Sequence, residues 1–191
     1  MKPTAKQAIQ ASFRTLLMAK SLDKITVRDI VEDCGITRNT FYYHYEDIYD
    51  LFDDYLDTRI YETWQELPKN CPWDQALSAL LESIFETPRM GRHIFYSKKQ
   101  DAMRQYLNKL LSSILQSHAA NVAHRITFED RKMICDACCY ALYGMLEQWL
   151  TGPDAGMLHH NLQRLLQCFS GAIHQAFAYC VDHPQSKEDI L

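Results

Sequence analysis

Residues 26–52 (TVRDIVEDCGITRNTFYYHYEDIYDLF) constrain the fold of this chain more than any other segment. Thr26 precedes an apolar pattern and has Asp29 three residues after it, an approximate capping box that would start a helix. Gly35 follows the pattern directly, where the end of a helix most often requires a left-handed residue. The apolar residues recur at the spacing of one buried helical face: Val27, Ile30, Val31 and Cys34. We therefore expect a short helix that ends at a glycine turn.

A second short helix is expected directly after this turn. Ile36 would fill the turn, and Thr37 is well placed to cap the next helix. Phe41 and Tyr45 are four residues apart and would hold that helix onto the first. Two short helices joined in this way form a helix-turn-helix, whose second helix lies in the major groove of DNA. The segment thus predicts a DNA-binding regulator rather than an enzyme.

The second helix carries polar side chains of the kinds that contact DNA. Arg38 and Asn39 lie in its first turn, the part of a recognition helix that reaches base edges. Arginine can pair with guanine and asparagine with adenine, while hydroxyl and imidazole groups suit phosphate oxygens. From the residues alone, a solvated helical hairpin whose tyrosines only pack is the alternative. The residues expected to contact DNA are Thr26, Arg28, Thr37, Arg38, Asn39, Thr40, Tyr42, Tyr43 and His44.

This segment resembles the tetracycline repressor (TetR) family of bacterial regulators. The family pattern runs roughly T-x-x-x-I-a-x-x-a-G-v-s-x-g-t-f-Y-x-h-F-x-s-K-x-x-L. The matching residues are Ile25–Val31, Cys34–Tyr45 and Leu51. The resemblance implies a homodimer on a palindromic operator in double-stranded DNA. It also implies a small-molecule effector, of unknown identity, bound in a helical body and coupled to the spacing of two DNA-binding heads.

The resemblance also assigns roles to single residues of the second helix. It implies that Thr37, Tyr42 and His44 contact phosphates and that Arg38 and Asn39 enter the groove. It places Phe41 and Tyr45 in the small core of the head.

One position departs from the family pattern. The family usually has a lysine just inside the fourth helix, where it grips the DNA backbone. Ile48 stands there in this chain, preceded by Glu46 and Asp47. We therefore expect one phosphate contact to be missing and the start of the fourth helix to be acidic.

The remainder of the chain has helical apolar spacing and no sustained alternation of the kind that marks strands. We expect an all-α fold of about nine helices. Residues 1–46 would form a three-helix helix-turn-helix head, and residues 47–191 a larger helical body for regulation, ligand binding and dimerisation. One helix is expected to run from Ile48 to about Leu67, and Gly152-Pro153 is expected to end the penultimate long helix.

The charge is divided between these two parts. The net charge of the chain is −4, which is unusual for a DNA-binding protein. Residues 1–45, however, hold seven basic and four acidic residues, so this segment is positive and the remainder is negative. A basic head on an acidic body concentrates attraction to phosphate in one place.

The last two long helices each carry a broad apolar face. These faces are wider than one chain should require, and Gly144, Gly171 and Ala172 would permit close approach of helices. Two such helices from each of two chains would form a four-helix interface. An ordinary core pair of helices is the alternative. The residues assigned to the dimer interface are Met145, Trp149, Leu162, Leu166, Phe169, Ile173 and Phe177.

Aromatic side chains with polar tips are available to line a ligand pocket in the body. Such side chains can form a mostly apolar cavity and orient a ligand, although at helical spacing each of them is more often a core residue. The residues assigned to this pocket are Tyr61, Trp64, Phe85, Phe95, Tyr96, Met103, Tyr106, Tyr143 and Trp149.

No catalytic residue, cofactor or metal site is predicted. Cys135 and Cys138 form a C-x-x-C motif, but no further zinc ligands stand nearby and no strand precedes it. Mid-helix cysteines behave as small hydrophobic residues, so we expect packing. The carboxylate pairs Asp53-Asp54 and Glu129-Asp130 are expected to be exposed charges at helix ends.

The expected compartment is the cytoplasm. No apolar run approaches the length of a membrane span, and the first residues lack the apolar core of a signal peptide. Seven cysteines without the spacing of a disulfide framework indicate reduced thiols.

Three functions are compatible with the sequence. The first is a dimeric repressor whose operator affinity responds to a small molecule. The second is a member of the same family whose body binds a protein partner, as an activator. The third is a helical enzyme or redox sensor that uses the cysteines.

Overall fold

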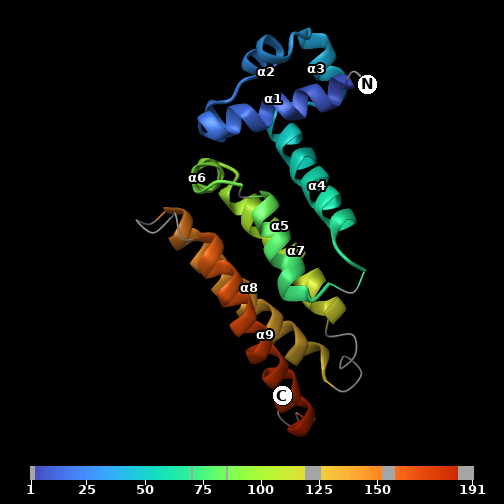
Figure 1. Ribbon diagram of the computed structural model, residues 1–191, viewed down its shortest axis with the longest axis vertical. Coiled ribbons are helices and arrows are strands. Elements are labelled where there is room, and N and C mark those ends of the chain that lie inside the picture. The colour runs from blue at the N-terminus through green and yellow to red at the C-terminus, as the bar shows by residue number, and fades with distance from the viewer. Residues whose placement is uncertain (1–2, 70, 85, 119–125, 152–157, 185–191) are drawn as a thin grey trace. The chain divides into compact units, whose positions relative to one another are not determined.

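The structure is a computed structural model that describes residues 3–69, 71–84, 86–118, 126–151 and 158–184. The described residues form nine α-helices and no strand (Figure 1), so the predicted all-α fold is confirmed. A short 3₁₀ turn lies between the first two helices, at Leu22–Lys24. The helices are α1 (Ala5–Ala19), α2 (Val27–Cys34), α3 (Arg38–His44), α4 (Ile48–Glu66), α5 (Trp73–Ile84), α6 (Pro88–Phe95), α7 (Gln100–His118), α8 (Phe128–Thr151) and α9 (Leu158–Asp182).

The chain divides into two compact units. The first unit contains Met1–Leu67 and Leu80–Met103, and the second contains Pro68–Ala79 and Arg104–Leu191. The first unit therefore includes α1–α4 together with α6, and the second includes α8 and α9. The functional division into residues 1–46 and 47–191 stays a prediction. In the described ranges, no helix has both the length and the apolar character that a membrane span needs.

The core of the first unit is built on α1. Thr4 starts this helix with a full capping box in which Gln7 is the partner. Phe13 has no exposed surface, and its ring centroid lies 6.3 Å from that of Phe52 and 5.5 Å from that of Tyr55 on α4. Burying a side chain of this size contributes about 1.5–3 kcal/mol. This packing joins the first helix of the head to α4.

The helix-turn-helix forms as the local sequence predicts. Thr26 and Asp29 make a reciprocal capping box at the start of α2. Gly35 ends α2 in the left-handed conformation, with φ of 66°, and Thr37 caps α3 by accepting a hydrogen bond from the Thr40 amide. Phe41, a residue of α3, has a fully buried side chain. The predicted capping box, glycine turn and N-cap are all confirmed.

α6 supplies donors to the C-terminal end of α1. The last carbonyl groups of a helix have no partner within the helix. His93 Nδ1 lies 2.7 Å from the carbonyl oxygen of Leu17, and Arg89 donates to the carbonyl oxygen of Ala19 at 3.1 Å. A carbonyl oxygen only accepts, so Nδ1 of His93 carries the hydrogen in this contact. The end of α1 is thus closed by side chains from outside residues 1–46.

Glu86 joins α1 and α4 through two arginine side chains. Arg14 donates to both carboxylate oxygens of Glu86, through Nε and Nη2. Arg59 of α4 lies within 3.7 Å of the same carboxylate. The hydrogen bond from Arg14 leaves the pKa of Glu86 below its ordinary value, although burial acts in the opposite direction. Glu86 is therefore an ionised link between two helices of the first unit.

α8 and α9 pack against one another in the second unit. Cys135, Cys138 and Cys139 are buried on α8, and all seven cysteines of the chain are free thiols. Burial raises the pKa of Cys138 and of Cys139 to about 11, so these thiols stay protonated at neutral pH. This is the behaviour expected of packing residues.

The prediction of exposed helix-end carboxylates is wrong for three of the four residues. Asp53 is exposed but lies inside α4 and not at its end. The other two, Asp54 and Asp130, are not exposed. Asp54 lies inside α4 and is partly buried, because it accepts hydrogen bonds from α1 and from Tyr45. Asp130 is 4% exposed and is bonded to Thr127 at the start of α8. In both cases a hydrogen-bond partner compensates for the burial of the charge.

The close approach of helices expected at Gly144, Gly171 and Ala172 concerns two chains and stays a prediction; among the described residues of one chain, no helix lies close to either glycine. A Cβ atom added to Gly144 or Gly171 would meet no other atom within 4 Å. Both glycines, and Ala172, are exposed. The predicted helix end at Gly152-Pro153 lies outside the described residues.

The left-handed turn at Gly35 yields a stability prediction. Gly35→Ala should lower the free energy of unfolding by about 1 kcal/mol, because an L residue with a positive φ is strained even where space is open. Urea unfolding followed by circular dichroism measures the change. Gly35→Asn is the matched variant and should cost less, since asparagine tolerates this conformation better. Equal stabilities of the alanine variant and the wild type would contradict the assignment.

Asp29 yields a pH prediction. A hydrogen bond from Lys20, followed by those from Thr26, lowers the pKa of Asp29 from 3.8 to about 2. The unfolded chain therefore binds a proton more readily than the folded one, and the stabilisation is present above pH 3.8 and is lost as the pH falls to about 2. In Asp29→Asn, the unfolding free energy should depend less steeply on pH across this window.

The control for this experiment is Asp33→Asn. Asp33 lies on the same helix and is exposed, so its removal changes the charge of α2 equally. The same pH dependence in both variants would exclude the link between Asp29 and Lys20.

Candidate nucleic-acid interface

The first turn of α3 presents two polar side chains that have no hydrogen-bond partner among the described residues. Arg38 and Asn39 are exposed, and within the described part of the chain neither side chain is hydrogen bonded to the protein. Thr37 caps the helix immediately before them and fixes where the turn begins. Both groups are therefore free to bond to an external partner such as a base edge.

The hydroxyl groups around α3 are only partly occupied. Thr37 Oγ1 and Thr40 Oγ1 lie 2.9 Å apart, so one of their two hydrogens is used between them. The other hydrogen remains available for a phosphate oxygen. The Thr26 hydroxyl differs, because it donates to Asp29 at 2.7 Å within the capping box. A phosphate contact from Thr26 would have to replace that bond.

The aromatic side chains of α3 divide between core and surface. Phe41 is fully buried, whereas Tyr42 is 57% exposed and Tyr43 is 83% exposed. Tyr43 meets the half-buried His44 edge-on, with ring centroids 5.0 Å apart. The Tyr42 ring meets the buried Phe41 ring edge-on, with centroids 5.6 Å apart, yet more than half of each tyrosine side chain stays exposed. This arrangement favours an external partner over the packed-hairpin alternative.

Arg28 of α2 lies in a weak ion pair. Its Nε is 2.6 Å from a carboxylate oxygen of Glu32 one turn later, and both side chains are more than 60% exposed. Exposed pairs of this kind contribute little to stability. The guanidinium can therefore exchange this partner for a phosphate at small cost.

At the start of α4, the protein's own carboxylates accept hydrogen bonds from backbone amides. Asp47 accepts hydrogen bonds from the amides of Tyr49 and Asp50, and the Asp50 carboxylate accepts one from the amide of Glu46. These three amides, of the kind that attract an anion at the start of a helix, thus donate to the protein's own carboxylates. Ile48, which stands where the family pattern has a lysine, is buried.

A network around Asp54 was missed by the reasoning from sequence. Asp54 accepts hydrogen bonds from Lys6 and Gln10 of α1 and from Tyr45, the residue that follows α3. The partners lie 48, 44 and 9 residues away along the chain, so no local spacing pattern signals them. This network holds the C-terminal end of α3, whereas the Thr37 cap fixes its N-terminal end.

The residues assigned to a ligand pocket lie in different environments. Phe95, Met103 and Tyr143 are buried, and Tyr106 and Trp149 are half-buried. The three others that can be placed are exposed, and Phe85 lies outside the described residues; the exposed ones are Tyr61, Trp64 and Tyr96. Six of the nine belong to the first unit, and Tyr106, Tyr143 and Trp149 belong to the second.

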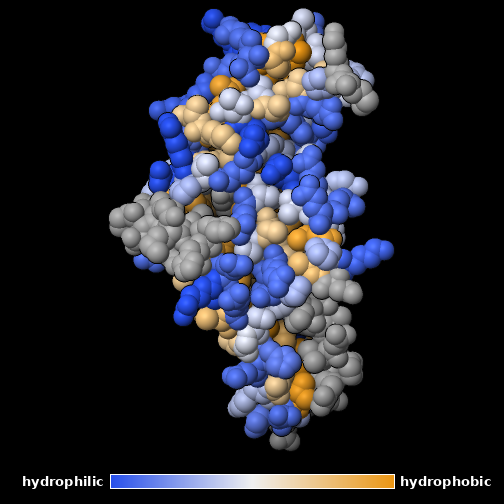
Figure 2. All heavy atoms as spheres, viewed as in Figure 1, coloured by the Kyte–Doolittle hydropathy of each residue, from blue (hydrophilic) through white to orange (hydrophobic). Residues whose placement is uncertain are grey.

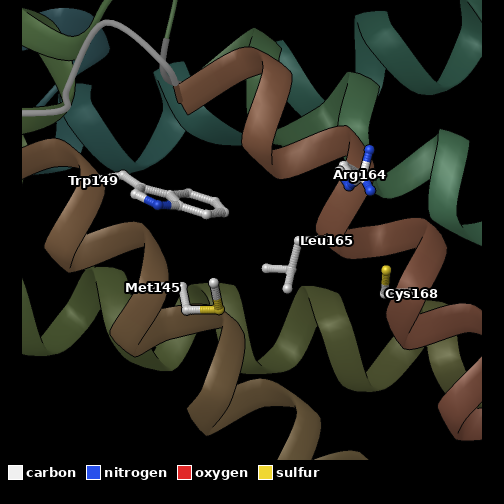
Figure 3. A pocket seen from close by; sticks show the side chains of 5 residues that line it. All are labelled: Met145, Trp149, Arg164, Leu165 and Cys168. Atoms are coloured by element: carbon white, nitrogen blue, oxygen red, sulfur yellow. The ribbon is translucent and has the colours of Figure 1, made fainter.

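Trp149 lines a pocket of about 350 Å³ between α8 and α9. Met145 and Trp149 reach this pocket from α8, and Leu165 points toward them from α9 (Figure 3). Arg164 and Cys168 complete its lining. The volume lies within the range of small-molecule pockets, and the lining is mostly apolar with one cation.

The residues assigned to a dimer interface fall into two groups. Met145, Trp149 and Phe169 are half-buried. The others are buried in the single chain: Leu162, Leu166, Ile173 and Phe177. The lower part of Figure 2, over α8 and α9, shows hydrophobic side chains among hydrophilic ones. Among the described residues, no group of three or more His, Cys, Asp or Glu side chains could hold a metal ion.

The sequence matches two family profiles. Residues 11–55 match the profile described as bacterial regulatory proteins of the tetR family. Residues 72–167 match a second TetR profile, described as the C-terminal region of a transcriptional regulator. No curated protein matches the sequence.

Solved structures share the fold. The dihydroxyacetone kinase operon activator DhaS superposes with a TM-score of 0.65 at 18% identity, over 85% of this chain and 94% of that chain. A protein described as a transcriptional regulator from Pseudomonas aeruginosa PAO1 gives a TM-score of 0.52 at 12% identity, over 91% and 92% of the two chains. At these identities the likeness concerns the fold alone.

The first profile covers the helix-turn-helix with its exposed polar side chains, and the second covers half of the chain, within the helical body. The protein therefore belongs to the TetR family of DNA-binding transcriptional regulators.

Proposed function

We propose that this regulator is a repressor that binds a palindromic operator as a homodimer and releases it when a small molecule binds in the body. The observation that carries the proposal is that the side chains of Arg38 and Asn39, in the first turn of α3, are exposed and have no hydrogen-bond partner among the residues that the structure describes. These are the two side chains expected to read bases. The proposed site of action is the cytoplasm, and no catalytic step is part of the proposal.

Sequence-independent attraction would come from the basic head. Residues 1–45 carry seven basic and four acidic residues, while the whole chain has a net charge of −4. The tyrosine and threonine hydroxyls of α3 would add hydrogen bonds to phosphates. These contacts hold the head on any duplex, and discrimination between sequences is left to Arg38 and Asn39.

Dimerisation is proposed through the outer surface of α8 and α9. An apolar stripe on α9 contains Leu165, Cys168, Ala172 and Tyr179, of which the last three are exposed. On α8, Gly144 and Ala141 are exposed beside the half-buried Met145. Small residues on both helices would let a second pair of helices approach closely. The buried residues assigned to the interface would support this surface from beneath.

Effector binding is proposed in the body. The pocket between α8 and α9, with Trp149 and Met145 on one side, supports it because its lining suits an apolar ligand. If the dimer forms on this surface, the ligand would lie at the seam and would change how the two chains meet. The buried aromatic residues Phe95 and Tyr143 remain further candidates for ligand contacts.

The mechanism that we propose is a shift between two dimer states. In one state the two recognition helices are spaced to match half-sites about 34–36 Å apart, or a multiple of that distance. The ligand binds the other state more tightly. A difference of about 1.4 kcal/mol in ligand affinity is enough for a tenfold loss of operator affinity.

The second candidate function is that of a TetR-family regulator whose body binds a protein partner, as an activator. Tyr61 and Trp64 are 66% and 51% exposed on α4, a surface that a protein could cover. One structure with this fold is named as an operon activator, so the fold does not decide the sign of regulation. The redox alternative has less support, because burial raises the pKa of the Cys135 and Cys138 thiols and thereby disfavours the reactive thiolate.

The base-reading assignment yields a prediction about specificity. Arg38→Ala and Asn39→Ala should each weaken binding to a selected operator by about 1–3 kcal/mol and relax the preference at one position. The measurement is selection of duplexes from a random library, followed by titration of the selected and scrambled sequences.

Tyr42→Phe is the contrast, because it removes a hydroxyl predicted to contact phosphate. It should weaken binding to both duplexes by a similar factor. Tyr61→Phe, an exposed tyrosine of α4, is the control for removal of a hydroxyl elsewhere. Unchanged sequence preference in Arg38→Ala and Asn39→Ala would refute base reading by these residues.

The dimer proposal is tested by a charge on the apolar stripe. Ala172→Arg should raise the dimer dissociation constant by about 100-fold or more, because an unpaired charge would be buried in the interface. Sedimentation velocity over a range of concentrations measures it. Gln163→Arg is the matched control, since residue 163 is exposed on another side of α9. A dimer that is unaffected by Ala172→Arg would place the interface elsewhere.

A further inference from the structure

Three segments of the first unit meet at one carboxylate, that of Asp54 on α4. Lys6 Nζ lies 2.8 Å from Oδ1, and Gln10 Nε2 lies 2.6 Å from Oδ2. The Tyr45 hydroxyl donates to Oδ2 at 2.7 Å. Lys6 and Gln10 belong to α1, and Tyr45 is the C-cap of α3. A single side chain therefore links the recognition helix to two other helices.

The contact with Tyr45 fixes the C-terminal end of α3. Tyr45 is 3% exposed, and its ring lies 5.8 Å from that of Phe41, beneath the recognition helix. Hydrogen bonds to an ionised carboxylate are shorter and stronger than neutral ones. Without Asp54, this largely buried hydroxyl would lose its acceptor, which is costly. The orientation of α3 thus depends on α4 through this bond.

The contact with Lys6 engages a cation that lies close to the recognition helix. Lys6 is in the first turn of α1, a helix that contacts α3, and its ammonium lies 5.9 Å from the centre of the Tyr45 ring. Figure 1 shows the N-terminal end of α1 beside α3. The Lys6 side chain is 49% exposed, so it is accessible to solvent. A free lysine here would attract any nearby phosphate, whatever the base sequence.

We propose that Asp54 is a positioning residue for DNA binding: it orients α3 through Tyr45 and withholds Lys6 from the phosphate backbone. Both actions raise the ratio of operator affinity to affinity for other DNA. The proposal rests on DNA binding through α3 and adds to it the control of specificity by a residue that itself contacts no base.

The protonation states agree with this role. Burial raises the pKa of Asp54, but the hydrogen bonds from Lys6, Tyr45 and Gln10 outweigh it and leave the pKa below its ordinary value. Burial, together with the neighbouring carboxylate, raises the pKa of Tyr45. At neutral pH, Asp54 is therefore the acceptor and Tyr45 the donor.

The test is Asp54→Asn, measured by fluorescence anisotropy with two labelled duplexes across a range of salt concentrations. One duplex is a sequence selected from a random library by the wild-type protein, and the other is its scrambled version. We expect tighter binding of the variant to the scrambled duplex. The slope of log affinity against log salt should become steeper by about 0.9, the value for one more phosphate neutralised. The ratio of the two affinities should fall.

Asp53→Asn is the matched control. It removes one negative charge from the neighbouring position of α4, but Asp53 is exposed and pairs with Lys99 rather than with α1 or α3. Identical slopes and affinity ratios in Asp54→Asn and Asp53→Asn would overturn the proposal. If instead the wild-type protein selects no duplex and binds none at low salt, DNA binding itself fails, which is a distinguishable result.

Two further variants separate the two actions. Lys6→Gln should leave the wild-type salt slope nearly unchanged, but it should abolish the extra slope when combined with Asp54→Asn. Tyr45→Phe should weaken binding to the selected duplex by about tenfold with no change in slope, since only the orientation of α3 is affected. These two single variants decide the question even if Asp54→Asn fails to fold, as judged by its thermal unfolding. A shallower slope in Lys6→Gln alone would show that Lys6 already contacts phosphate and would refute the proposal.

Discussion

The surface of α3 that is proposed to meet DNA depends on the burial of two aromatic side chains, Phe41 and Tyr45, at a very short helix. α3 has seven residues, and an isolated helix of this length is not stable in water. Phe41 has no exposed surface and Tyr45 has 3%. Their burial holds α3 in place, and Thr37 determines where it begins. The exposed polar side chains of α3 add little to stability themselves, so their placement comes from the packing beneath them.

Several basic side chains of the first unit form ion pairs with acidic side chains of the same unit. A basic side chain that has no such pair is therefore a better candidate for binding DNA. Arg14 is bonded to Glu86, Lys20 to Asp29 and Lys6 to Asp54. Arg38 has no such partner among the described residues. A basic head in which most cations are already paired has fewer charges for indiscriminate attraction to phosphate. Discrimination between sequences can then depend on a small number of unpaired groups.

Local features of the fold could be predicted from the sequence, because their causes lie within a few residues. The Thr26 capping box and the Gly35 turn are examples, since each depends on bonds or dihedral angles inside one turn. Features with distant causes could not. Asp54 has the composition of a surface carboxylate, and its burial results from partners up to 48 residues away. The pocket beside Trp149 could not be predicted either, because its lining residues come from two different helices, α8 and α9. A single sequence contains the residues of such contacts but not their pairing.

The closure of α1 by α6 has a consequence for dissecting the molecule. Leu17 and Ala19 receive their donors from His93 and Arg89, roughly seventy residues further along the chain. A fragment that ends at residue 46 would keep every side chain predicted to touch DNA and would lose these donors, along with the α4 surface on which Phe13 packs. The segment predicted to touch DNA is thus smaller than the packed unit that holds it, and we expect that a hybrid regulator made by exchanging heads would need α4 and α6 to travel with the head.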